Sequence, residues 1–196
     1  MVSLLLILIL ILDFAISLWN AYSSGYNVAL LNRTGGSGWL RAVSYSGLGL
    51  AFAGMAYVLS VALSAVAYYV GYVSQDALST VVAFAFLVFG ALIIGFGAMV
   101  TIQSIAVAMR RRGIWNILIA VWNSFAEIWD IAVYVESFGD AVSILKRERS
   151  EDEGADVILV IIVALLIAFF LTYSAYKHGQ KKAMGAGSYG REAFAA

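Results

Sequence analysis

Long apolar runs separated by short polar breaks make up most of the chain. These runs cover residues 2–31, 39–73, 77–109, 114–145 and 157–176. About 20 consecutive apolar residues suffice to cross the hydrocarbon layer as a helix, and each run reaches that length. The three central runs are longer than a bilayer needs, so those helices should tilt or project beyond it. The pattern predicts an all-α integral membrane protein with about five long transmembrane helices.

The polar breaks carry residues that end and start helices. The first break, residues 32–38, is rich in glycine, which favours a turn. In the second break, Ser74 or Asp76 can cap the helix that follows. We therefore expect one transmembrane helical domain over residues 1–182. A flexible cytoplasmic tail, rich in glycine and alanine, is expected over residues 183–196.

Basic residues set the expected orientation, because cytoplasmic loops are enriched in lysine and arginine. The arginines at 110–112 mark the cytoplasmic side most clearly. With five spans of the cell membrane, Arg33, Arg41 and the lysine-rich C-terminus are also cytoplasmic, and the N-terminus lies outside. The basic residues of 146–149 would then lie outside, against the rule. The alternative places 114–145 along the membrane surface as an amphipathic helix and leaves four spans.

Composition supports the membrane assignment and excludes several classes of function. Hydrophobic residues make up 63% of the chain and charged residues only 12%, whereas soluble domains carry roughly a quarter charged residues. The chain has no cysteine or proline and a single histidine, His178, so disulfides and zinc, haem or copper sites are not expected. The sequence contains no catalytic triad, phosphate-binding loop or nucleic-acid-binding pattern. We therefore expect no enzyme, no organic cofactor and no nucleic-acid partner, and a chain that contacts the lipid bilayer.

Two of the predicted helices carry polar residues at every seventh position. Each polar residue follows a large apolar side chain, which in the later helix is always tryptophan. The two ladders are Asp13, Asn20 and Asn27 in the first helix and Asn116, Asn123 and Asp130 in the fourth. Residues 13–27 align without gaps to residues 116–130, and the two helices run in opposite directions. This predicts an inverted repeat of helices one and two against four and five, as in many transporters. A chance match between apolar helices is the alternative.

The spacing also predicts where the acidic residues lie. A seven-residue step rises about 10.5 Å and drifts only about 20° around the helix, so each ladder forms a nearly straight stripe. We expect the two helices to cross at Asn20 and Asn123. Asp13 then lies level with Asp130, and Glu127 shares the face of that residue. Carboxylates in hydrocarbon are costly and repel one another, and neither ladder contains lysine or arginine. A proton or an oxygen-bound cation is the expected partner.

The leading hypothesis is a small membrane protein that handles cations or protons, as a channel or a carrier. Its ion- or proton-binding residues are Asp13, Asp130, Glu127, Asn20, Asn123 and Asn116. A channel would require a homo-oligomer or a larger membrane complex, because five helices leave little room for a pore. The alternative is a structural or accessory subunit whose ladders hold helices or partners together. Close helix contacts are expected at Gly47, Gly54, Gly90, Gly95 and Gly97.

Overall fold

The computed structural model describes residues 4–35, 37–111, 113–147 and 151–185. These residues form five α-helices: α1 (Leu4–Thr34), α2 (Gly38–Tyr69), α3 (Gln75–Arg111), α4 (Ile114–Leu145) and α5 (Glu151–Gly185). Each helix is long and apolar enough to cross a membrane. The predicted all-helical architecture with five candidate membrane spans is therefore confirmed, and it indicates a membrane protein.

Charged residues extend α5 beyond the apolar run that predicted it. The helix covers Glu151–Gly185, although the apolar run covers only 157–176. Acidic residues near the start of a helix and basic residues near its end both interact favourably with the helix dipole, so the charged flanks continue the helix. Residues 183–185, predicted as tail, belong to α5. The rest of the predicted tail, 186–196, and residues 2–3 of the first predicted span lie outside the described residues.

The turn between α2 and α3 depends on Gly71 and Ser74. Gly71 adopts a positive φ of 76°, which glycine reaches without steric cost, and α2 ends just before it. Ser74 Oγ accepts a hydrogen bond from the Ala77 N–H at 3.0 Å, which confirms Ser74 as a cap of α3. The Ser74 hydroxyl also donates to Glu153 Oε1 at 2.9 Å. The same side chain therefore starts α3 and links this turn to the start of α5.

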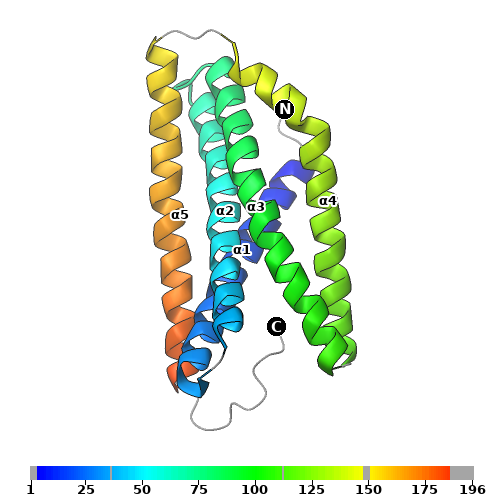
Figure 1. The fold of residues 1–196 in the computed structure, drawn as a ribbon. Coiled ribbons are helices and arrows are strands. Elements are labelled where there is room, and N and C mark those ends of the chain that lie inside the picture. Colours follow the sequence, from blue (N-terminus) through cyan, green and yellow to red (C-terminus); the bar gives the residue numbers. More distant parts are fainter. Residues whose placement is uncertain (1–3, 36, 112, 148–150, 186–196) are drawn as a thin grey trace.

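The helices alternate in direction, and the α3–α4 hairpin diverges from α2 and α5 toward the turn at 111–113 (Figure 1). Within the described part of the chain, α3 is the only helix with Cα atoms within 8 Å of those of α4, whereas α1 packs on α2 and α5. The predicted crossing of the first and fourth helices at Asn20 and Asn123 is therefore wrong. The two halves of the predicted inverted repeat also pack differently, because α1 contacts α2 whereas α4 does not reach α5. For much of its length α4 runs beside α3 (Figure 1), and like the other four helices it is long and apolar enough to span a membrane.

Close glycine contacts explain why α1 lies against α5. A Cβ added at Gly25 of α1 would collide with the backbone carbonyl of Tyr176 on α5. A Cβ added at Gly179 of α5 would collide with the backbone carbonyl of Tyr22 on α1. Membrane helices approach this closely only where side chains are minimal. The two glycines therefore allow the close α1–α5 contact.

A second set of small residues joins α1 to α2. Two serines spaced seven residues apart on α1 lie against two glycines with the same spacing on α2. The pairs are Ser24 with Gly47 and Ser17 with Gly54. Both serines are buried, so the glycines make room for hydroxyl groups between the helices. Gly95 on α3, also predicted at a close contact, has no neighbouring atom within 4 Å of an added Cβ.

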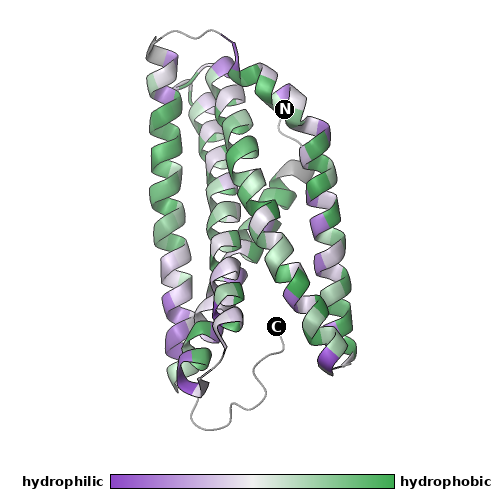
Figure 2. Cartoon of the chain, in the orientation of Figure 1, coloured by the Kyte–Doolittle hydropathy of each residue, from purple (hydrophilic) through white to green (hydrophobic). Residues whose placement is uncertain are grey.

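The hydrophobic core lies where α2, α3 and α5 meet. Its buried members are Met55, Ala56, Ala85, Phe89 and Ala168. Hydrophilic residues concentrate toward the ends of the helices, but α4 carries several along its middle (Figure 2). Two features therefore distinguish α4: among the described residues it packs on α3 alone, and it carries polar residues along the middle of its length.

Candidate functional site

Glu127 is the most buried acidic side chain that the structure describes. It lies in the middle of α4 and is 9% exposed. Its carboxyl group packs against Gly97 of α3, where a Cβ would collide with Glu127 Oε2. The other oxygen, Oε1, is buried and has no hydrogen-bond partner among the described residues. An ionised carboxylate in such surroundings is costly, so this group requires a compensating charge or a proton.

Two further carboxyl groups are linked to Glu127 electrostatically, one directly and the other through Asp130. Asp130, three residues later on the same face of α4, lies close enough to interact electrostatically with Glu127. The Asp13 carboxyl of α1 lies within electrostatic range of Asp130 and of the Tyr57 hydroxyl on α2. Asp13 and Asp130 are both half-buried. Electrostatic interactions therefore link Glu127 to Asp130 within α4, and Asp130 of α4 to Asp13 of α1.

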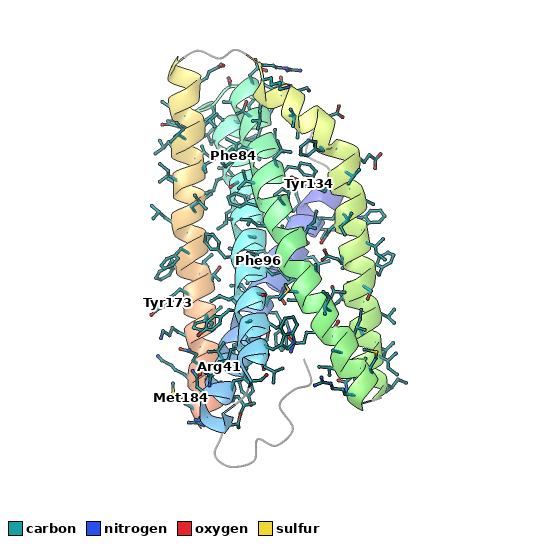
Figure 3. All side chains as sticks on the ribbon, in the orientation of Figure 1. Arg41, Phe84, Phe96, Tyr134, Tyr173 and Met184 are labelled. Atoms are coloured by element: carbon teal, nitrogen blue, oxygen red, sulfur yellow. The ribbon has the colours of Figure 1, made fainter. Side chains whose placement is uncertain are left out.

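Tyr134 holds α4 against α3 one turn beyond Asp130. Its hydroxyl donates a hydrogen bond to the Leu87 carbonyl of α3 at 3.0 Å. Its ring stacks on Phe86, with centroids 5.2 Å apart, and lies over Gly90. Tyr134 lies between the two helices in Figure 3. Tyr134 is not among the residues predicted from the sequence, although its position four residues after Asp130 on the same face was a usable signal.

Phe96 contributes the corresponding contact between α3 and α2. Its ring lies directly on Gly49 of α2, with ring atoms 2.7 Å from where a Cβ would stand (Figure 3). Phe96 and Gly97 are neighbours on α3, so one residue contacts α2 while the next receives the Glu127 carboxyl of α4. After Gly97, none of the α3 residues whose exposure is described is buried. This pair therefore marks the level at which the hairpin begins to diverge.

The predicted asparagine ligands lie apart from one another. Asn20 of α1 and Asn116 and Asn123 of α4 are half-buried. Thr101 Oγ1 of α3 donates to the backbone carbonyl of Asn123 at 3.3 Å. No hydrogen bond between these asparagine side chains and another described residue is present. Among the described residues, no Cα atom of α1 lies within 8 Å of one in α4. The structure therefore does not assemble the amides and the carboxyl groups into one ligand set.

The carboxyl groups also do not form a shared metal site. Among the described residues, no group of three or more histidine, cysteine, aspartate or glutamate side chains is arranged to hold a metal ion. Mg²⁺ needs near-octahedral coordination and Ca²⁺ takes six to eight oxygen ligands. This arrangement can hold and exchange protons without further ligands, whereas a bound cation would need oxygen atoms from water or a partner.

The two ends of the bundle differ in charge. The end containing the turns at 34–38 and 111–113 carries only basic charged residues in the described part of the chain. They are Arg33, Arg41, Arg110, Arg111, Lys177, Lys181 and Lys182. The opposite end is mainly acidic: Asp76, Glu136, Asp140, Glu151, Asp152, Glu153 and Asp156, with Lys146 and Arg147. The three carboxyl residues Glu127, Asp130 and Asp13, here called the carboxyl cluster, lie between these ends. No lysine, arginine or histidine of the described residues lies at their level.

Comparisons with known protein families, with curated proteins and with solved structures found no match for this chain. The comparisons therefore suggest no role for the carboxyl cluster.

Proposed function

We propose that this chain is a small membrane protein that handles protons or cations, as a channel or a carrier. The observation that carries the proposal is Glu127, a nine-tenths buried carboxyl group in a candidate membrane span, with an oxygen that lacks a hydrogen-bond partner in the described residues. Ionisable residues inside membrane spans are costly and mark ion or proton pathways by default. Asp130 and Asp13 extend the path from Glu127, because both are half-buried.

The asparagines have a secondary role in this proposal. Asn123 and Asn116 precede Glu127 in the sequence and lie between it and the basic end of α4, whereas Asn20 lies on α1. Carboxamide oxygens and N–H groups can hold water or an ion without adding charge. We propose that these residues line a hydrated route to the carboxyl cluster. A channel of this kind would complete its pore with a second copy of the chain or with other subunits.

The test is flux into liposomes that contain the purified protein. Proton and cation fluxes are measured for the wild type, for Glu127→Gln and for the double variant Asp13→Asn/Asp130→Asn. Glu136→Gln is the matched control, because Glu136 lies on the same helix but is exposed. The proposal expects flux that is lost in Glu127→Gln and in the double variant and kept in Glu136→Gln. Wild-type flux no higher than in empty liposomes would reject it.

A second candidate function, assembly with a partner, is favoured by the surroundings of α4. This helix packs on α3 alone, and its Asn116 and Asn123 amides make no side-chain hydrogen bond within the described residues. In hydrocarbon, such amides are satisfied by polar groups of another helix. In that case the ladders of α1 and α4 bind other subunits. The inverted repeat then consists of α1 and α4 alone and does not include α2 and α5. Disulfide formation by Asn123→Cys, in a chain without cysteine, would detect a symmetric pairing of two copies.

We also propose an orientation in the cell membrane. The basic end of the bundle faces the cytoplasm, in accordance with the enrichment of lysine and arginine on that side. The start of α1 then lies at the outer side, and the end of α5 lies inside. The basic residues Lys146 and Arg147 at the outer end are accompanied by a larger number of acidic residues.

A further inference from the structure

We infer that the species held by the carboxyl cluster is a proton, and that Glu127 is the residue that holds it. This inference rests on the proposed function and narrows it. A metal cation shared among the three carboxyl groups would be the competing occupant. The two differ in what they require, because a proton needs one oxygen atom and a cation needs a shell of ligands.

The contacts of Glu127 leave little room for a ligand shell. On one side, Oε2 lies against the Gly97 backbone, at a point where even a methyl group would collide. The neighbours of Gly97 on α3, Phe96 and Ala98, have no side-chain oxygen. Thr101, one turn further along α3, uses its hydroxyl to donate to the Asn123 carbonyl. The α3 side of Glu127 therefore does not supply the oxygen ligands that a dehydrated cation requires.

The charges around Glu127 lead to the same conclusion. On α3, the helix packed against α4, the titratable residues of the described part are Asp76, Arg110 and Arg111, all at the helix ends. On α4 itself the nearest is Asp130, and beyond it lie Asp13 of α1 and Tyr57 of α2. None of these near groups supplies positive charge. Protonation neutralises Glu127 at its own oxygen and removes the cost of burying an unpaired anion.

The geometry also assigns different roles to the three carboxyl groups. Glu127 is buried, whereas Asp130 and Asp13 are half-buried and more accessible to water. A proton that leaves Glu127 can therefore pass to the outside of the cluster through Asp130, which shares its helix face. In this arrangement Glu127 is the storage position and Asp130 the exchange position.

The test uses a hydrophobic carbodiimide on the full-length wild-type protein in liposomes. A protonated carboxyl group adds across one C=N bond of the reagent, forming a C–O bond while its proton moves to nitrogen. The acyl group then migrates from oxygen to nitrogen, giving a stable N-acylurea without an oxidant or a leaving group. Mass spectrometry of proteolytic peptides locates the adduct. Because a carboxylate does not start this addition, labelling reports the protonated acid.

We expect labelling of Glu127 that decreases with rising pH, by up to about tenfold per unit once the group ionises. The labelling should be unchanged by Na⁺, Ca²⁺ or Mg²⁺ at constant pH and ionic strength. Protection of Glu127 by any of these cations would overturn the inference, and so would adducts at Asp13 or Asp130 in place of Glu127, or the lack of any adduct. The wild-type measurement does not depend on whether a variant folds. Glu127→Gln should lose the adduct, and Glu136→Gln should keep it.

The labelling and flux experiments can fail separately. Labelling of Glu127 without proton flux would reject transport while supporting proton binding. Flux of a cation that also protects Glu127 from the reagent would support the proposed function and reject the proton assignment.

Discussion

The carboxyl group of Glu127 on α4 lies directly against the backbone of Gly97 on α3. This contact places a buried acid at the level where the α3–α4 hairpin begins to diverge from α2. The contact requires glycine at position 97, because any side chain would occupy the position of Oε2. Gly97 thus connects the packing of the hairpin to the proposed proton site.

Gly97→Ala is therefore expected to displace the Glu127 side chain. Overpacking a tight contact typically costs about 1–3 kcal/mol, and we expect a loss at or below the low end of this range because the Glu127 carboxyl group can rotate away. Proton flux should decrease as well, because the carboxyl group moves away from its buried position. Thermal unfolding in detergent, followed by circular dichroism, measures the first effect, and the liposome assay measures the second.

Gly95→Ala is the matched control for this substitution. Gly95 lies on the same helix two residues earlier, is exposed, and has no atom within 4 Å of an added Cβ. Its replacement should leave stability and flux near the wild-type values. If Gly97→Ala and Gly95→Ala behave alike, the close contact between Gly97 and Glu127 is not present in the membrane.

The sequence predicted the secondary structure well because membrane spans depend on long apolar runs. Residues 114–145, for example, form α4 over the same range. The end of α5 was missed because hydropathy does not register a helix that continues through charged residues such as Lys181. The capping role of Ser74 followed from local chemistry, so sequence reasoning could reach it.

The helix neighbours could not be predicted in the same way. The ladder spacing put Asp13, Glu127 and Asp130 at similar depth, and in the structure Asp130 lies within electrostatic range of both Glu127 and Asp13. This proximity arises without a crossing of α1 and α4, because single glycines in α1 and α5 pair those two helices instead. One contact glycine in each helix, Gly25 and Gly179, gives no repeated pattern to recognise. The difference in burial between Glu127 and Asp130 likewise depends on α3, which periodicity within α4 does not report.

The α1–α5 contact gives a second prediction. Gly25→Ala and Gly179→Ala each place a Cβ against a backbone carbonyl, which cannot rotate away as a side chain can. We expect each variant to lose about 3 kcal/mol or more, because the two helices must separate. Gly154→Ala is the control on α5, since an added Cβ there has open space. Unfolding in a series of SDS concentrations would measure the difference, and equal midpoints for all three variants would contradict the contact.

Arg33 gives a third prediction at the basic end. Its guanidinium donates to the Ala183 and Met184 carbonyls at 2.9 Å each, so it satisfies backbone oxygens that the end of α5 leaves unpaired. Arg33→Gln should loosen the last turn of α5 by about 1 kcal/mol or less, because the pair is largely solvent-accessible. Faster hydrogen exchange in the last two turns of α5 in this variant than in the wild type would show the loosening. Arg41→Gln, an exposed arginine at the same end, should leave that exchange unchanged.

The charge difference between the two ends gives a fourth prediction, about orientation. The chain has no cysteine, so a cysteine introduced by substitution is the only thiol in the variant. Its labelling therefore reports on which side of the membrane that position lies. Gly38→Cys lies at the basic end and Gln75→Cys at the acidic end, and both positions are exposed. Because basic residues are retained in the cytoplasm, a membrane-impermeant maleimide added to intact cells should label Gln75→Cys at once. Gly38→Cys should react only after permeabilisation. The reverse pattern would place the basic end outside, and labelling of both before permeabilisation would show that the chain inserts in two orientations.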